Sequence, residues 1–153
     1  IYITFQGNSV EFGPSSTIQL LRANEWGTTI NRVHIEDGEI EIGPSGHVQG
    51  NVLNQFSMDE YNDYFRIATT TGEVSIWGGS PALNHVYVLD LDLKIVGRLE
   101  NLAHGEKIHS ARFMGDRGYL VTVKKIDPLF VLDLSDPRDP KVLGQRKTTA
   151  YTA

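Results

Sequence analysis

Short apolar segments recur along the chain, and this repetition constrains the fold more than any other feature of the sequence. The words VYVLD, KIVG and FRIA have counterparts LFVLD, KVLG and YLVT further along, at offsets of 43, 47 and 54 residues. The matching pairs are 86–90 with 129–133, 94–97 with 141–144, and 65–68 with 119–122. The chain is therefore predicted to be an array of similar structural units.

The repeated words have the composition of β-strands rather than helices. Fifteen glycines, six prolines and many Thr, Val and Ile residues interrupt any helical period. Alternating or apolar runs are bounded by turn dipeptides such as Asp37-Gly38 and Asp136-Pro137. A helical turn is expected only over 101–107. Strands are predicted at 1–5, 17–21, 28–35, 39–42, 52–58, 64–70, 85–90, 94–99, 109–114, 118–124, 129–133 and 141–146.

Four short strands in about 40–55 residues are the size of a β-propeller blade, a four-stranded antiparallel sheet packed radially around a channel. We therefore predict an all-β fold with about three such blades, in a single domain over residues 1–153. The blades lie at approximately 1–46, 52–100 and 109–147. The first blade begins at its second strand, and the strand at 17–21 is an extra element or part of a long connection.

Three blades are too few to close a ring, because closed propellers contain at least about 4. Two copies would supply six blades, so we expect a homodimer that forms a six-bladed ring. The segment 148–153 has strand-forming residues and no place in the third blade. We expect it to be exchanged, so that it supplies the missing innermost strand of the partner's first blade.

Composition excludes several other classes of protein. A chain of 153 residues with 40% hydrophobic and 22% charged residues is typical of a globular domain. The absence of cysteine excludes disulfides and thiolate zinc sites. A net charge of −5 disfavours nucleic acid or an anionic membrane as partner. No apolar run has the length of a membrane span, and the N-terminus lacks the basic region of a signal peptide.

Longer words of the sequence carry a resemblance to a known family. They are GNVLNQFSMDE at 50–60, FRIATT at 65–70, GEKIHSARFMGD at 105–116, YLVT at 119–122, DPLF at 127–130 and DLSDP at 133–137. Their order resembles a family of bacterial and archaeal secreted β-propeller domains that is distantly related to WD-repeat propellers. The resemblance covers residues 28–147 and implies a propeller fold, an extracellular or cell-surface setting and no established activity. It supplies no catalytic residues, and this chain is much shorter than a typical member.

Ligand sites of repeat folds gather where loops converge, which in a propeller is the channel mouth. The candidate residues near one such face are His47, His85, His104, Glu106 and His109, together with Arg112 and Trp77. Histidines and carboxylates are ligands for zinc, copper or nickel, but no pair here has a ligand spacing such as H-E-x-x-H. The histidines are equally consistent with ordinary polar residues in loops that bind no metal. Arg112 could instead have a structural role, either in an ion pair between blades or as a side chain that covers apolar sheet. Trp77 could likewise fill the gap between two blades.

Three functional hypotheses follow, with no catalytic residue, metal or cofactor assigned. The first is a non-catalytic binding or scaffolding module for a protein, peptide or glycan. The second is a hydrolase or lyase that uses His104, Glu106, His109 and Arg112 at the channel mouth. The third is a truncated family member without activity. An enzyme needs these side chains within hydrogen-bonding reach of one another or of a shared substrate, whereas a binding module needs only an exposed patch.

Overall fold

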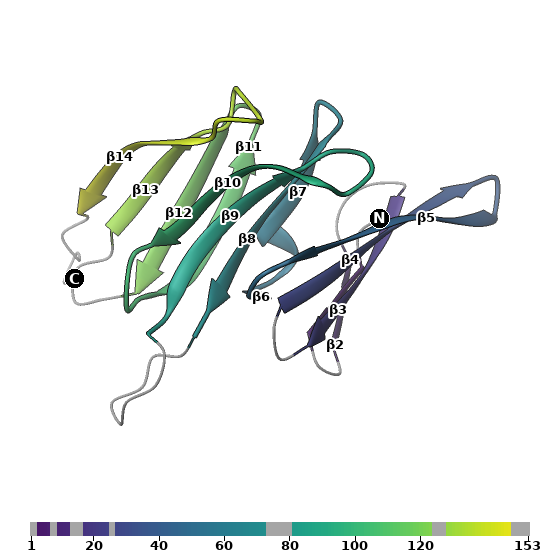
Figure 1. Cartoon of the computed structure of the whole chain (residues 1–153), viewed down its shortest axis with the longest axis horizontal. Coiled ribbons are helices and arrows are strands. Elements are labelled where there is room, and N and C mark those ends of the chain that lie inside the picture. Colours follow the sequence, from purple (N-terminus) through teal and green to yellow (C-terminus); the bar gives the residue numbers. More distant parts are fainter. Residues whose placement is uncertain are drawn as a thin grey trace, which may run out of the picture.

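The computed structural model describes the backbone of residues 3–6, 9–12, 17–24, 27–72, 81–123 and 128–147, and side chains within 27–72, 81–122 and 129–146. In these ranges the chain forms β-strands and a single turn of 3₁₀ helix, arranged in three sheets in sequence order (Figure 1). No helix in this part of the chain has the length and hydrophobicity of a membrane span. The predicted exchanged strand at 148–153 and the loop 73–80, which contains Trp77, lie outside the described residues.

The second and third sheets are antiparallel meanders with the strand order that the repeat predicts. The strands of the second sheet are β6 (Asn51–Val52), β7 (Met58–Tyr61), β8 (Tyr64–Thr71), β9 (Leu83–Leu89) and β10 (Ile95–Leu102). Their order in the sheet is β10-β9-β8-β6, and β7 also pairs with β8. The third sheet has the order β11-β12-β13-β14; its strands are β11 (Lys107–Met114), β12 (Arg117–Val123), β13 (Pro128–Asp133) and β14 (Lys141–Lys147).

The first strand of the second sheet is interrupted, although the sequence predicts one strand over 52–58. A 3₁₀ turn, η1 (Gln55–Ser57), separates β6 from β7. The side-chain oxygen of Asn54 caps this turn, because it accepts hydrogen bonds from the Phe56 N–H at 3.0 Å and from the Ser57 hydroxyl at 3.4 Å. The turn leaves the Phe56 side chain half exposed at the edge of the sheet.

The first sheet differs most from the sequence-based expectation. It has the order β2-β1-β3-β4-β5, with strands β1 (Ile3–Gln6), β2 (Ser9–Phe12), β3 (Thr17–Asn24), β4 (Gly27–Glu36) and β5 (Glu39–Val48). β3 pairs with β4 along its whole length, so it takes the place expected of 1–5 and is not an extra element. β1 lies beyond β3 and is parallel to it. A tight turn at Asp37 and Gly38, both with positive φ, joins β4 to β5.

Two apolar cores hold the three sheets together. Phe65, Ile67 and Tyr87 of the second sheet pack with Ile30 and Val48 of the first. On the opposite face of the second sheet, Ala68 and Val86 pack with residues of the third, namely Ile108, Ala111, Leu120, Phe130, Leu132 and Leu134. The second sheet is therefore buried on both faces.

The strand register corrects the repeat alignment by one residue. Leu89 pairs with Phe65, and its counterpart Leu132 pairs with Gly118. The offset between β8 and β12 is consequently 53 residues and not the predicted 54, which makes Tyr119 the counterpart of Arg66. A shift of one residue matters because it moves every side chain of a strand to the other face of the sheet.

The first strands of the second and third sheets lie along a common inner edge. β11 contacts both η1 and β7, and β6 contacts β1 and β4 of the first sheet. Residues exposed on β6, η1 and β11 therefore share this edge, which we call the inner edge.

A buried arginine joins the second sheet to the third. The Arg66 side chain is only 2% exposed, and its Nε and second guanidinium nitrogen donate to the two carboxylate oxygens of Asp59, each at 2.7 Å. Its remaining nitrogen donates to the Gly115 carbonyl in the β11–β12 turn. The guanidinium carbon also lies 5.1 Å from the Tyr61 ring centroid and 5.4 Å from that of Phe113. Burial of this charge is tolerable because every side of the guanidinium has a partner.

We expect Arg66→Ala to destabilise the fold by about 3–5 kcal/mol, because removing one partner of a buried ion pair leaves the other charge unpaired. Urea denaturation measures this loss. Arg98→Ala is the matched control, since Arg98 is 60% exposed and pairs with Glu100 at 3.5 Å, and it should cost less than about 1 kcal/mol. Equal losses in the two variants would contradict a structural role for Arg66.

Candidate binding site

The exposed side of β11 carries basic side chains. Lys107, His109 and Arg112 are exposed, while Ile108 and Ala111 between them are buried in the core. A register shift between Ile108 and Ser110 breaks the alternation of the strand, which is why His109 and Arg112, three residues apart, are both exposed. β11 contains no acidic residue. It is therefore a basic strip in a chain of net charge −5.

Arg112 lies over an aromatic ring supplied by the neighbouring sheet. Its guanidinium carbon is 4.0 Å from the ring centroid of Phe56 in η1. The ring is 50% exposed, so the pair forms an open platform on the inner edge. Such a cation–π contact at an exposed site contributes about 0.5–1 kcal/mol, enough to restrict the arginine without consuming its hydrogen-bond donors.

A cavity of about 260 Å³ lies between the second and third sheets, beside the start of β11. Its lining mixes apolar and polar groups: Asn51, Val52, Leu53, Thr70, Gly72, Lys107 and Ile108. The volume is smaller than the ~300–1,000 Å³ typical of pockets that enclose whole small molecules. It suits one side chain or one small group of a larger ligand.

His85, a predicted site residue, is a buried structural residue. Its ring is 3% exposed, and Nδ1 accepts a hydrogen bond from the Asn101 N–H at 3.2 Å. Nε2 of the neutral ring therefore carries the proton and donates to the Thr71 hydroxyl at 2.8 Å. Burial lowers the pKa of His85 below 6.5, and the nearby charge of Glu100 offsets part of that effect. The ring connects β8, β9 and β10 and is not available to a ligand.

Glu106 and its backbone help to hold the connection between β10 and β11. Its carboxylate accepts a hydrogen bond from the Thr122 hydroxyl at 2.5 Å. Its carbonyl accepts from the side-chain amide of Asn84 at 2.7 Å, and the same amide donates to the Leu102 carbonyl at 3.1 Å. Asn84 is fully buried, so it fixes this connection against the second sheet.

The remaining predicted histidines are exposed and lie at the same end of the sheets. His47 is near the end of β5, His104 is between β10 and β11, and His109 is on β11. His47 lies 3.5 Å from the Thr29 hydroxyl through Nδ1. Within the described ranges, no group of three or more His, Cys, Asp or Glu residues is arranged to hold a metal ion. Of the predicted residues, the structure thus places His109 and Arg112 together on β11.

Sequence reasoning did not identify Phe56, Leu53 or Asn84 as site residues. Phe56 and Leu53 occur in the word VLNQF, which resembles an ordinary strand. Their exposure results from the 3₁₀ turn that Asn54 caps. The sequence signal for that turn was the Asn-x-x-Ser spacing, because Asn is a preferred residue at the start of a helical turn.

We expect the free energy of unfolding to decrease as the pH falls below 6.5, through the range down to the lowered pKa of His85. In that range the unfolded chain binds a proton that the native His85 resists, so lower pH favours unfolding. Protonation of Nδ1 would also abolish its bond with the Asn101 N–H. Urea denaturation above and below pH 6.5 should show this decrease, and His85→Gln should remove it. His104→Gln, at an exposed position, should retain it, and an unchanged profile in His85→Gln would contradict the assignment.

Comparisons with known proteins agree with the observed architecture. The family described as "Beta propeller domain" matches residues 2–153 of this chain. An uncharacterised protein of Methanocaldococcus jannaschii is 46% identical over 126 residues, which are 82% of this chain and 19% of that protein. An uncharacterised protein of Archaeoglobus fulgidus is 40% identical over 126 residues, 81% of this chain and 19% of that protein. The chain thus spans about a fifth of the length of these relatives. With its antiparallel sheets and this match along nearly its whole length, the chain belongs to the beta propeller domain family.

Proposed function

We propose that the chain is a non-catalytic binding or scaffolding module that recognises an acidic peptide segment along its inner edge. The observation that carries the proposal is the exposed row of Lys107, His109 and Arg112 on β11, with Arg112 positioned over Phe56. Guanidinium and ammonium groups bind carboxylates through charge-assisted hydrogen bonds, which are the stronger class. A local basic strip in an acidic chain favours an acidic ligand over a neutral one.

The cavity beside β11 favours a peptide over a glycan as the ligand. Val52, Leu53 and Ile108 give it an apolar wall, and Lys107 lies at the same opening. An acidic peptide offers an apolar side chain for the cavity and carboxylates for the cations within the same few residues. A glycan offers carboxylates but little apolar surface of that shape.

Location and assembly belong to the same proposal. The resemblance to secreted propeller domains supports an extracellular or cell-surface location. We also propose that each sheet is one blade and that two copies form a six-bladed ring, since about 4 blades are the minimum for closure.

We expect a fluorescein-labelled peptide of alternating Glu and Leu to bind the chain, with an affinity that falls as salt is added. Arg112→Ala should weaken binding by about tenfold or more, because a hydrogen bond to a charged group contributes about 1.5–3 kcal/mol. Fluorescence anisotropy provides the measurement. Phe56→Ala should also weaken binding, since it removes the platform under Arg112.

Arg138→Ala is the matched control, because Arg138 is an exposed arginine in the β13–β14 connection, away from the inner edge. It should leave the affinity unchanged. Equal weakening by Arg138→Ala would show a general charge effect and overturn the assigned site. Binding of an oligogalacturonate, with no binding of the peptide, would replace the peptide ligand with an acidic glycan.

A further inference from the structure

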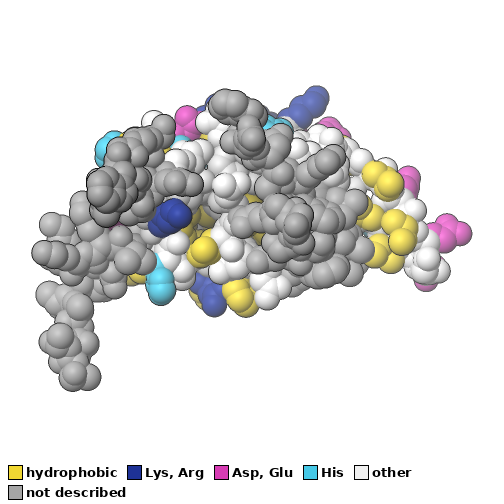
Figure 2. Space-filling model, turned by 90° about the horizontal axis from the view of Figure 1, so that it is seen from below, with side chains coloured by type: hydrophobic (Ala, Val, Ile, Leu, Met, Phe, Trp, Pro, Cys, Tyr) yellow, Lys and Arg dark blue, Asp and Glu magenta, His cyan; other side chains and the backbone are white. Residues whose placement is uncertain are grey.

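Two exposed apolar surfaces lie at opposite ends of the row of sheets (Figure 1). At one end, β14 exposes Val142 and Leu143, the latter to 52%. At the other end, the β4–β5 hairpin exposes Ile40 to 69% and Ile42 to 74%. Hydrophobic and acidic side chains gather together at the end where this hairpin lies (Figure 2).

In each of the first two sheets, a loop of the following sheet packs directly against a glycine in the last strand. At Gly46 on β5, an added Cβ would collide with the Leu93 carbonyl in the β9–β10 loop. At Gly97 on β10, it would collide with the Pro137 carbonyl in the β13–β14 loop. Gly144 on β14 is the counterpart of Gly97, since the two glycines pair with the counterparts Val131 and Val88. Among the residues that the structure describes, nothing lies within 4 Å of a Cβ at Gly144.

The outer face of the third sheet is open in the same way. In the second sheet, the side chains that face the next sheet are all buried: Arg66, Ala68, Val86 and Val88. Their counterparts in the third sheet are only partly buried: Tyr119, Val121, Leu129 and Val131. This face therefore has the apolar residues for a sheet contact and the glycine for a loop contact.

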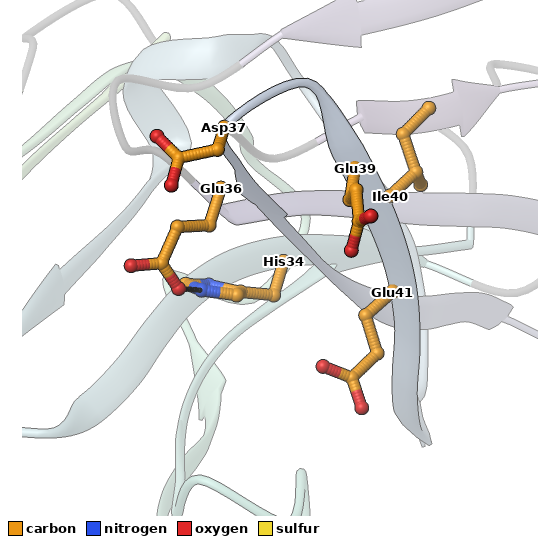
Figure 3. Close-up of a pocket in the computed structure, with 6 residues that line it drawn as sticks. All are labelled: His34, Glu36, Asp37, Glu39, Ile40 and Glu41. Atoms are coloured by element: carbon orange, nitrogen blue, oxygen red, sulfur yellow. Dashed lines mark hydrogen bonds and ion pairs between the residues drawn. The ribbon is translucent and has the colours of Figure 1, made fainter.

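The β4–β5 hairpin has one apolar and one acidic face. Cross-strand pairs define them: Val33 with Ile42 and Ile35 with Ile40 on the apolar face, and His34 with Glu41 and Glu36 with Glu39 on the acidic face. Figure 3 shows Ile40 pointing away from the acidic side chains. Glu36 and Glu39 are like charges opposite each other, which is unfavourable without a cation nearby. His34 lies 3.3 Å from Glu36 through Nε2.

Basic residues surround the open glycine on β14. Lys141, Gly144 and Arg146 pair with Asp133, Val131 and Leu129, which lie two residues apart along β13 and thus share one face. That face is the open one, so Lys141 and Arg146 flank Gly144 on it. Both side chains are exposed, and β14 contains no acidic residue. Lys141 already pairs through Nζ with a carboxylate oxygen of Asp139 at 3.1 Å, so a contact on this face depends on Gly144 and on the apolar residues of β12 and β13.

We propose that the β4–β5 hairpin of a second copy docks on the outer face of β14 and leads the first sheet of that copy onto the open face of the third. The hairpin is the first sheet's equivalent of the loops that cover Gly46 and Gly97. Along β4, Ile30, His34 and Glu36 alternate onto one face, through which Ile30 packs on the chain's own second sheet. The opposite, apolar face of the hairpin, with Ile35 and Ile40, therefore meets the open face of the other copy's third sheet. The occupant is a second copy, because the chain itself carries both complementary surfaces at its two ends.

This contact is heterologous, since it joins two different surfaces. In a dimer it occurs twice, and the two contacts are related by a two-fold axis, so the assembly closes without free ends. The inference specifies the surfaces of the dimer proposed above. It concerns β14, which lies at the opposite edge of the third sheet from β11, and the dimer and peptide binding are measured by separate experiments.

Sedimentation velocity of the native chain should show a species of twice 17.0 kDa. Gly144→Leu should convert it to a folded monomer, because the new side chain has free space in one copy but occupies the position of the docking hairpin. Gln145→Leu is the matched control on the neighbouring residue, which pairs with Phe130 and so lies on the opposite face. It should remain dimeric, and circular dichroism should show both variants folded.

A second pair of variants tests the hairpin surface. Ile40→Lys/Ile42→Lys should be monomeric, because it places charges on the apolar face that meets the other copy. Glu39→Gln/Glu41→Gln, on the opposite face of the same hairpin, is the matched control and should remain dimeric.

A native chain that is monomeric would overturn the proposal and would indicate that further sheets of a longer chain cover this face. A dimer that survives Gly144→Leu or Ile40→Lys/Ile42→Lys would overturn the assigned surfaces. Peptide binding is measured separately by fluorescence anisotropy, so a failure of the dimer proposal can be distinguished from a failure of the peptide-binding proposal.

Discussion

The second sheet is apolar on both faces, and the need to cover both faces determines how the other two sheets are placed. Every residue from Asn84 to Leu89 in β9 is buried, which explains why this strand has the continuous apolar word VYVL rather than an alternating pattern. Its counterpart in β13 has the equally apolar word LFVL, yet Leu129 and Val131 are only partly buried. The sequence of β13 is thus that of a strand covered on two sides, whereas the described part of this chain covers one.

Buried polar groups define how neighbouring sheets sit against each other. Apolar contacts have no direction, but hydrogen bonds between buried groups require one geometry. Arg66 donates to the Gly115 carbonyl, and Asn84 donates to the Glu106 carbonyl, so the second sheet is tied to the third at opposite ends of their contact. The Thr28 hydroxyl donates to the Gly50 carbonyl at 2.6 Å and holds the entry to the second sheet against the first. Each of these acceptors is a backbone group of a turn or connection, a position where carbonyls otherwise need water.

Strand positions in the second and third sheets follow from the sequence, because each apolar word is bounded by Gly, Pro or Asp and recurs. Their spatial order follows too, since consecutive antiparallel strands with short turns lie next to each other. The place of 17–24 does not follow, because periodicity does not determine which of two strands pairs with β4. The helical turn expected over 101–107 is absent, since β10 continues to Leu102 and Ala103 has a positive φ of 49°.

The candidate site also follows from the sequence only in part. Strand order alone predicts that four histidines lie toward one end of the sheets, namely His47, His85, His104 and His109. Whether a side chain at that end is exposed depends on the face of its strand to which it points. The His85 ring points inward and is enclosed by hydrogen bonds with Thr71 and Asn101. At β11, the register shift next to His109 places two basic residues on one surface that strict alternation would have separated. Local irregularities, namely this shift and the η1 turn under Phe56, therefore create the exposed basic and aromatic surface on an otherwise regular sheet edge.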